Sequence, residues 1–256
     1  MGHALLVRDS TASTNDDAWE ALATLGDGAA VVALVQTRGR GRDGRAWTQV
    51  PGRGLALSVV LRLGGDVRRA GAIPLAAGLA VVRATHALGV PGARLKWPND
   101  VLVNGRKLAG VLCEVRRAAG GGNAVVIGVG LNVAHSREEF PTELRELGTS
   151  LAIEGSAATL EDAAAAVLTN LEPLWNELQE GDSSAVLAEW SRWASHWGEW
   201  VSVRTPAGLV EGIAQRLDSD GGLVLRTSAG LETTIVAGDV SAPGDVSAPK
   251  EGCDAA

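Results

Sequence analysis

Three apolar runs rich in β-branched residues constrain the fold of this chain more than any other feature. They span residues 29–36, 55–63 and 124–133. Runs of this length and composition predict strands that are buried on both faces. We therefore expect a central sheet, and the first run delivers the chain directly into a loop rich in arginine and glycine.

Helical patterns lie between and after these runs. Ser13 followed by an acidic first turn predicts the start of a helix, and Gly26 predicts its end. Apolar residues at helical spacing predict further helices at residues 73–89, 136–148, 159–180 and 183–198.

Hairpin signals between residues 93 and 117 indicate that the sheet is not purely parallel. The segments "ARLKW", "VLV" and "KLAGVLCEVR" have the composition of strands, and "PND" and the pair Asn104-Gly105 separate them as turns. Because hairpins join antiparallel strands, this order predicts an α/β (α+β) fold with a mixed central sheet flanked by helices.

The pattern changes at Trp200, where short alternating segments separated by glycine-containing turns predict a small β-barrel. The repeated "GDVSAP" of the tail is rich in Pro, Gly, Ser and Ala, which predicts disorder. We expect a first domain at residues 1–198, a barrel at 199–240 and a disordered tail at 241–256. Four tryptophans with the spacing of one helix face are expected to pack against the barrel: Trp190, Trp193, Trp197 and Trp200.

Charge and composition exclude several classes of function. The 256 residues carry a net charge of −7, which argues against general binding to nucleic acid or to an anionic membrane. The 2 cysteines form no disulfide framework and no zinc spacing. The first residues lack a signal-peptide apolar region, and no apolar run approaches the roughly 18 residues of a membrane span. We therefore expect a cytoplasmic protein that holds no metal through cysteine.

The loop "GRGRDGRAW" at residues 39–47 is a local concentration of positive charge in this acidic chain. Its glycines fit G-x-G-x-x-G, but no amphipathic helix follows, so a Rossmann dinucleotide site is not favoured. Composition leaves three interpretations open. They are a solvated surface loop, an RNA-binding segment, and a loop whose N–H groups and arginines close on a small anionic ligand.

Lysine is scarce, because only three of the 23 lysines and arginines are lysine. Lys96 and Lys107 lie in "KWPNDVLVNGRKLAG", and Lys250 lies in the tail. A lysine is a compact point charge that fits a tight site beside a reacting phosphate, where the planar guanidinium of arginine does not. The retained pair therefore suggests a lysine-specific task.

The motifs "STN", "GRGRDGRAW", "KWPNDVLVNGRKLAG" and "GVGLNV", in this order, resemble those of the biotin–protein ligases, which attach biotin to a lysine of the biotin carboxyl carrier domain of carboxylases. The similarity covers about residues 8–240. It implies a mixed sheet flanked by helices, followed by an SH3-like barrel. Some members carry an N-terminal helix-turn-helix. Because only about a dozen residues precede "STN" here, we expect no DNA binding.

The resemblance also implies a reaction in two steps. Biotin's carboxylate attacks the α-phosphate of MgATP to give biotinyl-5′-AMP and pyrophosphate, and the carrier lysine then attacks this anhydride and releases AMP. Local cations would cancel the repulsion between carboxylate and triphosphate. The implied partners are biotin, ATP with Mg²⁺ and the carrier domain, without a tightly bound prosthetic group or a membrane. A homodimer formed along sheet edges stays open.

Site residues carried over by motif position fall into three groups. The catalytic group is Lys107, Arg40 and Arg42. The biotin-binding group is Ser13, Thr14, Asn15, Gln36, Arg40, Gly41, Arg42 and Lys107. The nucleotide-binding group is Arg42, Arg45, Trp47, Asn99, Asp100, Lys107 and Asn132. In this scheme Lys107 bridges biotin's carboxylate and the α-phosphate, while Trp47 stacks on adenine. The metal ligands stay unknown, and Asp43 departs from the basic residue or histidine expected at its position.

Two other functions stay open. A lipoate or octanoate ligase or transferase of the same superfamily would need a pocket for an aliphatic chain. A nucleic-acid-binding module using the loop predicts salt-dependent RNA binding that survives the loss of Lys107.

Overall fold

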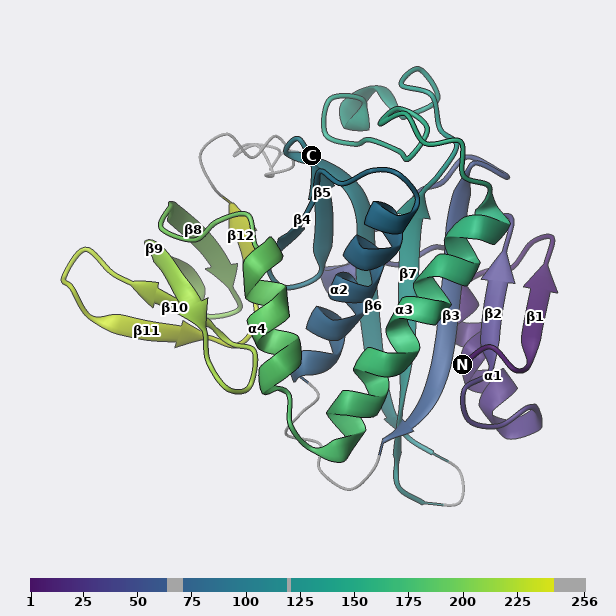
Figure 1. The fold of residues 1–256 in the computed structure, drawn as a ribbon, viewed down its shortest axis with the longest axis horizontal. Helices are drawn as coiled ribbons and strands as arrows, with labels where there is room; N and C mark the ends of the chain where they lie inside the picture. Colours follow the sequence, from purple (N-terminus) through teal and green to yellow (C-terminus); the bar gives the residue numbers. More distant parts are fainter. Residues whose placement is uncertain (64–70, 119–120, 242–256) are drawn as a thin grey trace, which may run out of the picture.

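A seven-stranded mixed sheet forms the centre of the protein, whose computed structural model describes residues 1–63, 71–118 and 121–241 (Figure 1). The strands lie in the order β1-β2-β3-β7-β6-β5-β4, and only the β1–β2 pair is parallel among the described strands of this sheet. Their bounds are β1 Leu5–Arg8, β2 Ala30–Ala33, β3 Gly54–Leu63, β4 Ala93–Lys96, β5 Asp100–Val103, β6 Arg106–Arg117 and β7 Asn123–Asn132. The predicted mixed sheet flanked by helices is confirmed.

The two faces of this sheet receive different partners. Helices α2 (Ala72–Ala87) and α3 (Leu160–Glu180) cover one face, and α1 (Thr14–Thr24) covers part of the other (Figure 1). Alternation along β3 shows the division, because Leu57 and Val59 join the α2 core whereas Val60 packs with α1. The face that α1 leaves uncovered is available for a site.

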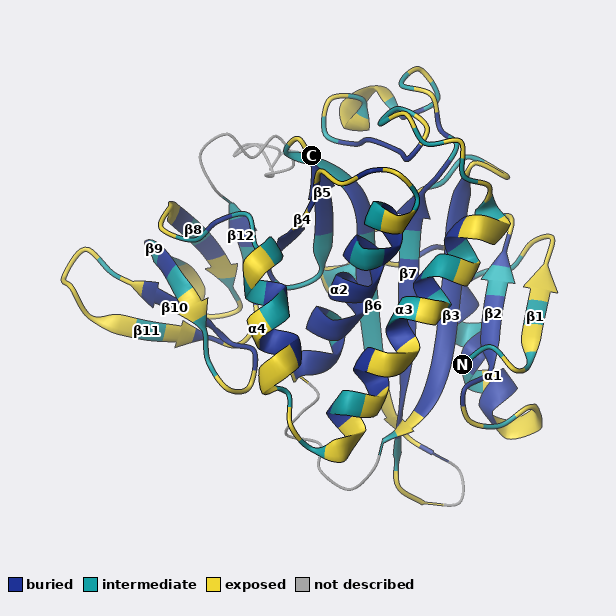
Figure 2. Ribbon diagram, viewed as in Figure 1, coloured by how far each residue is buried: buried dark blue, intermediate teal, exposed yellow. Residues whose placement is uncertain are grey.

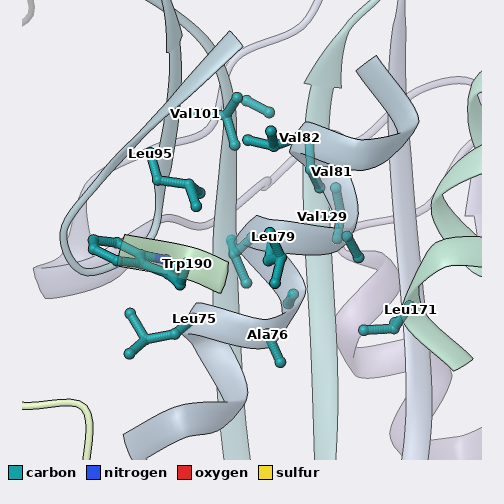
Figure 3. Close-up of a cluster of buried hydrophobic side chains, with 14 of the residues drawn as sticks. Leu75, Ala76, Leu79, Val81, Val82, Leu95, Val101, Val129, Leu171 and Trp190 are labelled. Atoms are coloured by element: carbon teal, nitrogen blue, oxygen red, sulfur yellow. The ribbon is translucent and has the colours of Figure 1, made fainter. Parts of the chain in front are cut away.

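The main hydrophobic core lies between the sheet and helices α2 and α3, and the central strands β3 and β7 are buried along most of their length (Figure 2). Leu79 of α2 is 0% exposed and lies at the centre of this cluster (Figure 3). Its neighbours in the close-up come from five other elements: Leu95 of β4, Val101 of β5, Val129 of β7, Leu171 of α3 and Trp190 of α4.

A second sheet of five antiparallel strands packs beside the first, as the barrel prediction requires (Figure 1). Its order is β11-β10-β9-β8-β12, and helix α4 (Ser184–Trp193) lies between the two sheets. The bounds are β8 Trp200–Thr205, β9 Gly208–Leu217, β10 Leu223–Arg226, β11 Glu232–Ile235 and β12 Asp239–Ser241. Val203, Leu223 and Val240 belong to the same hydrophobic cluster as the first sheet's core, so the core is continuous.

The helix predicted at residues 136–148 is wrong. This segment forms only one 3₁₀ turn, Thr142–Leu144. Pro141 explains the difference, since its ring disfavours helical backbone at the preceding residue and it has no N–H for a helical bond. Phe140 instead stacks on His135, with ring centroids 4.9 Å apart.

The helix predicted at residues 183–198 is shorter than expected, and the four tryptophans do not share a helix face. Helix α4 ends at Trp193 because Ala194 is extended, and the Ser195 N–H donates to the Leu95 carbonyl, 2.9 Å away, at the open edge of β4. Trp190 is buried, but Trp200 is exposed on β8. Pairing with a sheet edge has therefore overridden the helical spacing.

The predicted domain bounds at 198/199 and 240/241 stay predictions, and the tail beyond residue 241 lies outside the described residues. In the described part of the chain, no helix combines the length and apolar character needed to cross a bilayer. Strand β1 presents Leu5 and Val7 to solvent at the free edge of the sheet (Figure 2). The sheet-edge homodimer also stays a prediction.

We expect Leu79→Ala to lower the free energy of unfolding by roughly 2–5 kcal/mol, because the cavity left among α2, β4 and β7 cannot collapse fully. Urea denaturation followed by circular dichroism measures the change. Leu5→Ala is the matched control: its side chain is 51% exposed, so its effect should stay within about 0.5 kcal/mol. Equal effects of the two changes would contradict this assignment of the core.

Candidate functional site

The arginine- and glycine-rich loop lies across the sheet face that α1 leaves uncovered. Arg40 and Ala46 form an isolated antiparallel bridge, and residues Arg42–Gly44 between them form a 3₁₀ turn. Asp43 has a φ of 55°, a left-handed conformation that Asp tolerates better than most residues. The residue that departs from the expected pattern therefore suits the turn of this loop.

Glycines on β6 and β7 form the floor beneath the loop. Gly128 and Gly130 project to the same side of β7, and a Cβ added at Gly130 would overlap the Trp47 ring. A Cβ added at Gly128 would likewise overlap the Asn15 amide. The "GVGLNV" motif thus has a steric reason: its alternate residues build the core on one face and keep the other face bare.

Hydroxyl and amide groups close one end of this floor. The Ser58 hydroxyl lies 2.7 Å from both Thr14 Oγ1 and Asn15 Oδ1, and Gln36 Oε1 accepts from the Thr14 backbone N–H at 2.8 Å. Ser13 begins α1 without a side-chain capping bond. The side chains of Ser13, Thr14, Asn15 and Ser58 are nearly inaccessible to water, so this end presents a buried, pre-arranged set of donors and acceptors.

A β-bulge brings Lys107 onto the glycine face. The β5–β6 register shifts between Val101 and Leu102, so that Leu108 and Ala109 both enter the core. Without the shift, Lys107 and Gly110 would project to opposite faces. With it, Lys107 Nζ lies 2.7 Å from Asp100 Oδ1 and 5.8 Å from the centre of the Trp47 ring.

Arg40 pairs with two carboxylates. Its terminal nitrogens make a bidentate contact with Asp16 at 2.7 and 2.8 Å, and one of them lies 3.4 Å from Glu114 Oε2. The hydrogen bond from Arg40 lowers the pKa of Asp16, and Asp16 in turn raises the pKa of Arg40. The pair therefore stays ionised at neutral pH.

The other two arginines of the turn reach the second sheet. Arg42 donates to Asn99 Oδ1 and to the Gly238 carbonyl, both at 3.2 Å, and lies 3.5 Å from Asp239. Arg45 forms an ion pair with the same Asp239. The loop is thus tied at one end to α1 and at the other to β12.

Two cavities meet at Trp47 and Lys107. The first has a volume of about 130 Å³ and lies over the glycine floor. The second has a volume of about 240 Å³, and apolar side chains of residues 140–147 form much of its wall. Ala46, Trp47 and Lys107 line both cavities, so these residues mark the boundary between a polar compartment and a more apolar one.

Asn132 and His135 belong to the second cavity. The Asn132 amide donates to the Thr149 carbonyl at 2.9 Å, which fixes the segment that follows β7. Burial lowers the pKa of His135, so its ring is neutral at pH 7. Because the Val50 N–H donates to His135 Nε2 at 3.4 Å, the ring proton resides on Nδ1.

The structure brings the predicted site residues together. Twelve of them line the first cavity: Ser13, Thr14, Asn15, Gln36, Arg40, Gly41, Arg42, Arg45, Trp47, Asn99, Asp100 and Lys107. Asn132 lines the second cavity, beside Trp47 and Lys107. Their roles toward a ligand stay predictions.

Sequence reasoning missed the residues that support these groups. Asp16, Ser58, Glu114 and Asp239 come from α1, β3, β6 and β12, and no local motif joins them. The alternation of Gly128 and Gly130 in a strand was a usable signal for a bare face. Burial raises the pKa of the Cys113 thiol to about 12, so this thiol is not a nucleophile at neutral pH.

Across residues 1–63, 71–118 and 121–241, no group of three or more His, Cys, Asp or Glu side chains is placed to hold a metal ion. Asp100 and Asp239 are each engaged by a cation of the site.

Comparison with known families identifies two matching segments. Residues 7–132 match the biotin/lipoate A/B protein ligase family, and residues 196–242 match the biotin protein ligase C terminal domain. The first segment includes every predicted site residue, and the second covers the five-stranded sheet.

Individual relatives extend the match over most of the chain. The biotin–[acetyl-CoA-carboxylase] ligase of Mycobacterium tuberculosis is 38% identical over 238 residues, covering 90% of this chain and 85% of the relative. The corresponding ligase of Paracoccus denitrificans is 34% identical, covering 87% and 94%. The biotin protein ligase of Aquifex aeolicus, solved in complex with biotin and ATP, is 28% identical, with a TM-score of 0.80 over 94% of this chain and 99% of that one.

We expect Gly130→Ala to displace Trp47 from the floor, because the added methyl group overlaps the indole ring. Loss of this contact should make the peptide bonds after Arg42 and Arg45 more susceptible to trypsin, which limited proteolysis and mass spectrometry detect. Gly92→Ala is the control, since a Cβ there meets only Val103, at 3.6 Å. Unchanged cleavage in Gly130→Ala would show that the loop does not depend on the glycine floor.

Proposed function

This chain belongs to the biotin protein ligase family, and we propose that it activates biotin as biotinyl-5′-AMP and transfers it to a lysine of a biotin carboxyl carrier domain. In the first step a biotin carboxylate oxygen attacks the α-phosphorus of ATP, and the bond to the β-phosphate bridging oxygen breaks, releasing pyrophosphate. In the second step the lysine ε-amine attacks the acyl carbon, AMP leaves, and the amine proton passes to solvent.

The observation that carries this proposal is the position of Lys107 at the meeting point of the two cavities. A reaction that joins an acid to a nucleotide needs one compartment for each reactant and a cation where they meet. The polar cavity and the apolar cavity supply the compartments. Lys107 supplies a compact charge where the carboxylate would approach the α-phosphate.

The closed end of the first cavity suits the ureido ring of biotin. That ring has two N–H donors and one carbonyl acceptor, all of which need partners once they leave water. Thr14 and Asn15, which are buried, and Gln36, which is partly buried, provide hydroxyl, amide and carbonyl groups in one cluster. Ser13 lines the same cavity.

Arg40 and Arg42 extend from the loop over the part of the cavity that would receive the carboxylate and the phosphates, with Gly41 between them. Each is held by a carboxylate of the protein, and each retains its full charge as an arginine. Placed guanidinium groups of this kind offset the repulsion between two anionic reactants without rearranging during the reaction.

The second cavity would receive the adenine base. Trp47 offers an aromatic face for stacking, and Asn132 offers a donor and an acceptor to the edge of the base. Arg45, Asn99 and Asp100 line the first cavity on the side that leads to the second sheet, where the phosphates would extend. Mg²⁺ would enter the site as part of the MgATP complex.

Ligand entry requires movement of the loop. Ligand pockets usually enclose about 300–1,000 Å³, whereas the first cavity encloses about 130 Å³. The loop contacts the rest of the site mainly through ion pairs and through Trp47 on the glycine floor. These contacts suit a loop that opens to admit reactants and closes to shield the acyl-adenylate from water.

Two observations bear on the alternatives. An aliphatic lipoate or octanoate chain has no hydrogen-bonding groups to match the hydroxyl and amide groups at the Ser58 end of the cavity, which disfavours such acids. A nucleic-acid-binding loop would present its charges to solvent. Here Arg40, Arg42 and Arg45 each pair with a carboxylate, and this disfavours the binding module.

We expect pyrophosphate release from MgATP to require biotin, and Lys107→Ala to slow it at least about 100-fold, because the carboxylate and α-phosphate then meet without a shared cation. A coupled phosphatase assay with biotin, lipoate, octanoate or no acid measures this. Lys107→Arg keeps the charge but changes its shape. We expect this variant also to release pyrophosphate well below the wild-type rate.

Lys250→Ala is the control, since that lysine lies in the tail and outside both family matches. If pyrophosphate release required lipoate or octanoate and not biotin, the protein would be a lipoate or octanoate ligase instead. No release with any acid would contradict the proposal.

A further inference from the structure

Glu114 on β6 joins the polar end of the first cavity to the loop. Its Oε2 accepts from Asn15 Nδ2 at 2.9 Å and lies 3.4 Å from a terminal nitrogen of Arg40. Asn15 Oδ1 in turn accepts from the Ser58 hydroxyl at 2.7 Å. One carboxylate oxygen therefore contacts a residue proposed to bind the ureido ring and a residue proposed to bind the carboxylate.

The charge on Glu114 fixes both neighbours in one orientation. A carboxylate only accepts hydrogen bonds, so Asn15 must turn its NH₂ group toward Glu114 and its carbonyl oxygen toward Ser58. Arg40 is held from the other side by the bidentate contact with Asp16 of α1. With carboxylates on two sides, the guanidinium group has little freedom to rotate.

We propose that Glu114 and Asp16 are positioning residues that place Arg40 for the adenylation step, and that Glu114 makes this placement depend on Asn15 in the ring-binding end of the cavity. The inference rests on the proposed function for its chemistry. Occupation of the ring-binding end stabilises the Asn15 orientation that Glu114 requires. The loop arginine is then held where the substrate carboxylate lies.

A glutamine at this position separates the two contacts. Glu114→Gln keeps an oxygen that accepts from Asn15 Nδ2, but removes the negative charge that faces Arg40. Asp16→Asn removes a charge from the other side of Arg40 and does not alter the bond to Asn15. We expect each variant to lower kcat for biotin-dependent pyrophosphate release about ten-fold, with KM for biotin changed less than about two-fold.

Glu114→Ala removes both contacts, so KM for biotin should rise as kcat falls. Arg116→Gln is the matched control, because Arg116 lies 3.7 Å from the other oxygen of Glu114 and its side chain is 51% exposed. It should leave both kinetic constants unchanged. Thermal unfolding of each variant identifies any loss caused by misfolding rather than by misplacement.

Trypsin cleavage after Arg40 in the free protein tests the placement without turnover. We expect Glu114→Gln and Asp16→Asn to be cleaved faster than the wild type and the Arg116→Gln control. Wild-type protein that releases no pyrophosphate would overturn the proposed function, while the cleavage rates would still report on Arg40.

Two outcomes would overturn the inference itself. If Asp16→Asn raised kcat, the Asp16–Arg40 pair would be a restraint that opposes the reaction. If both neutral variants matched the wild type in kcat and in cleavage, the two carboxylates would not place Arg40.

Discussion

The site depends on a steric constraint in the middle of the main sheet. Strand β7 must carry large apolar side chains on the face toward the core and no side chains on the opposite face, where the loop lies. Val129 and Leu131 fill the core beneath α2 and α3, while Gly128 and Gly130 leave room for the Asn15 amide and the Trp47 ring. A strand normally achieves such asymmetry with polar residues on its outer face. Here only glycine allows aromatic and amide groups to lie directly on the backbone, so the bare face becomes a binding floor without loss of the core behind it.

Charge is arranged around this floor in pairs. Asp16 faces Arg40, Asp100 faces Lys107, and Asp239 faces Arg42 and Arg45. Ion pairs that keep contact with solvent contribute little to stability, so these partly exposed pairs matter for orientation rather than for folding energy. The acids keep the long cationic side chains from folding away into solvent. They also explain how an acidic protein can present a cationic site without a basic surface.

Much of the fold and of the site was predictable because the signals were local. The three buried strands, the Asn104-Gly105 turn and helix α3 follow from period and turn chemistry within a few residues, and Asn104 and Gly105 both adopt the positive φ that this turn requires. Twelve predicted site residues meet in one cavity because the motifs lie at strand ends and loops of one sheet face. The bulge that turns Lys107 onto that face was not predictable, since it arises from pairing with β5. The wrong prediction of a helix at residues 136–148 has a local cause. The composition of the segment is compatible with a helix, but the single residue Pro141 prevents one.

The second sheet is part of the site and not an appendage to it. Trp97 at the end of β4 donates its indole N–H to the Gly221 carbonyl at 3.0 Å, and this contact seats the second sheet against the turn that carries Asn99 and Asp100. In this position of the second sheet, Asp239 of β12 and the Gly238 carbonyl contact the arginines of the loop. The loop is therefore anchored on two bodies: α1 through Asp16, and β12 through Asp239. Because the core is continuous between the sheets, a shift of the second sheet would move the anchor of Arg42. The position of the second sheet therefore sets the position of the groups that hold the loop over the glycine floor.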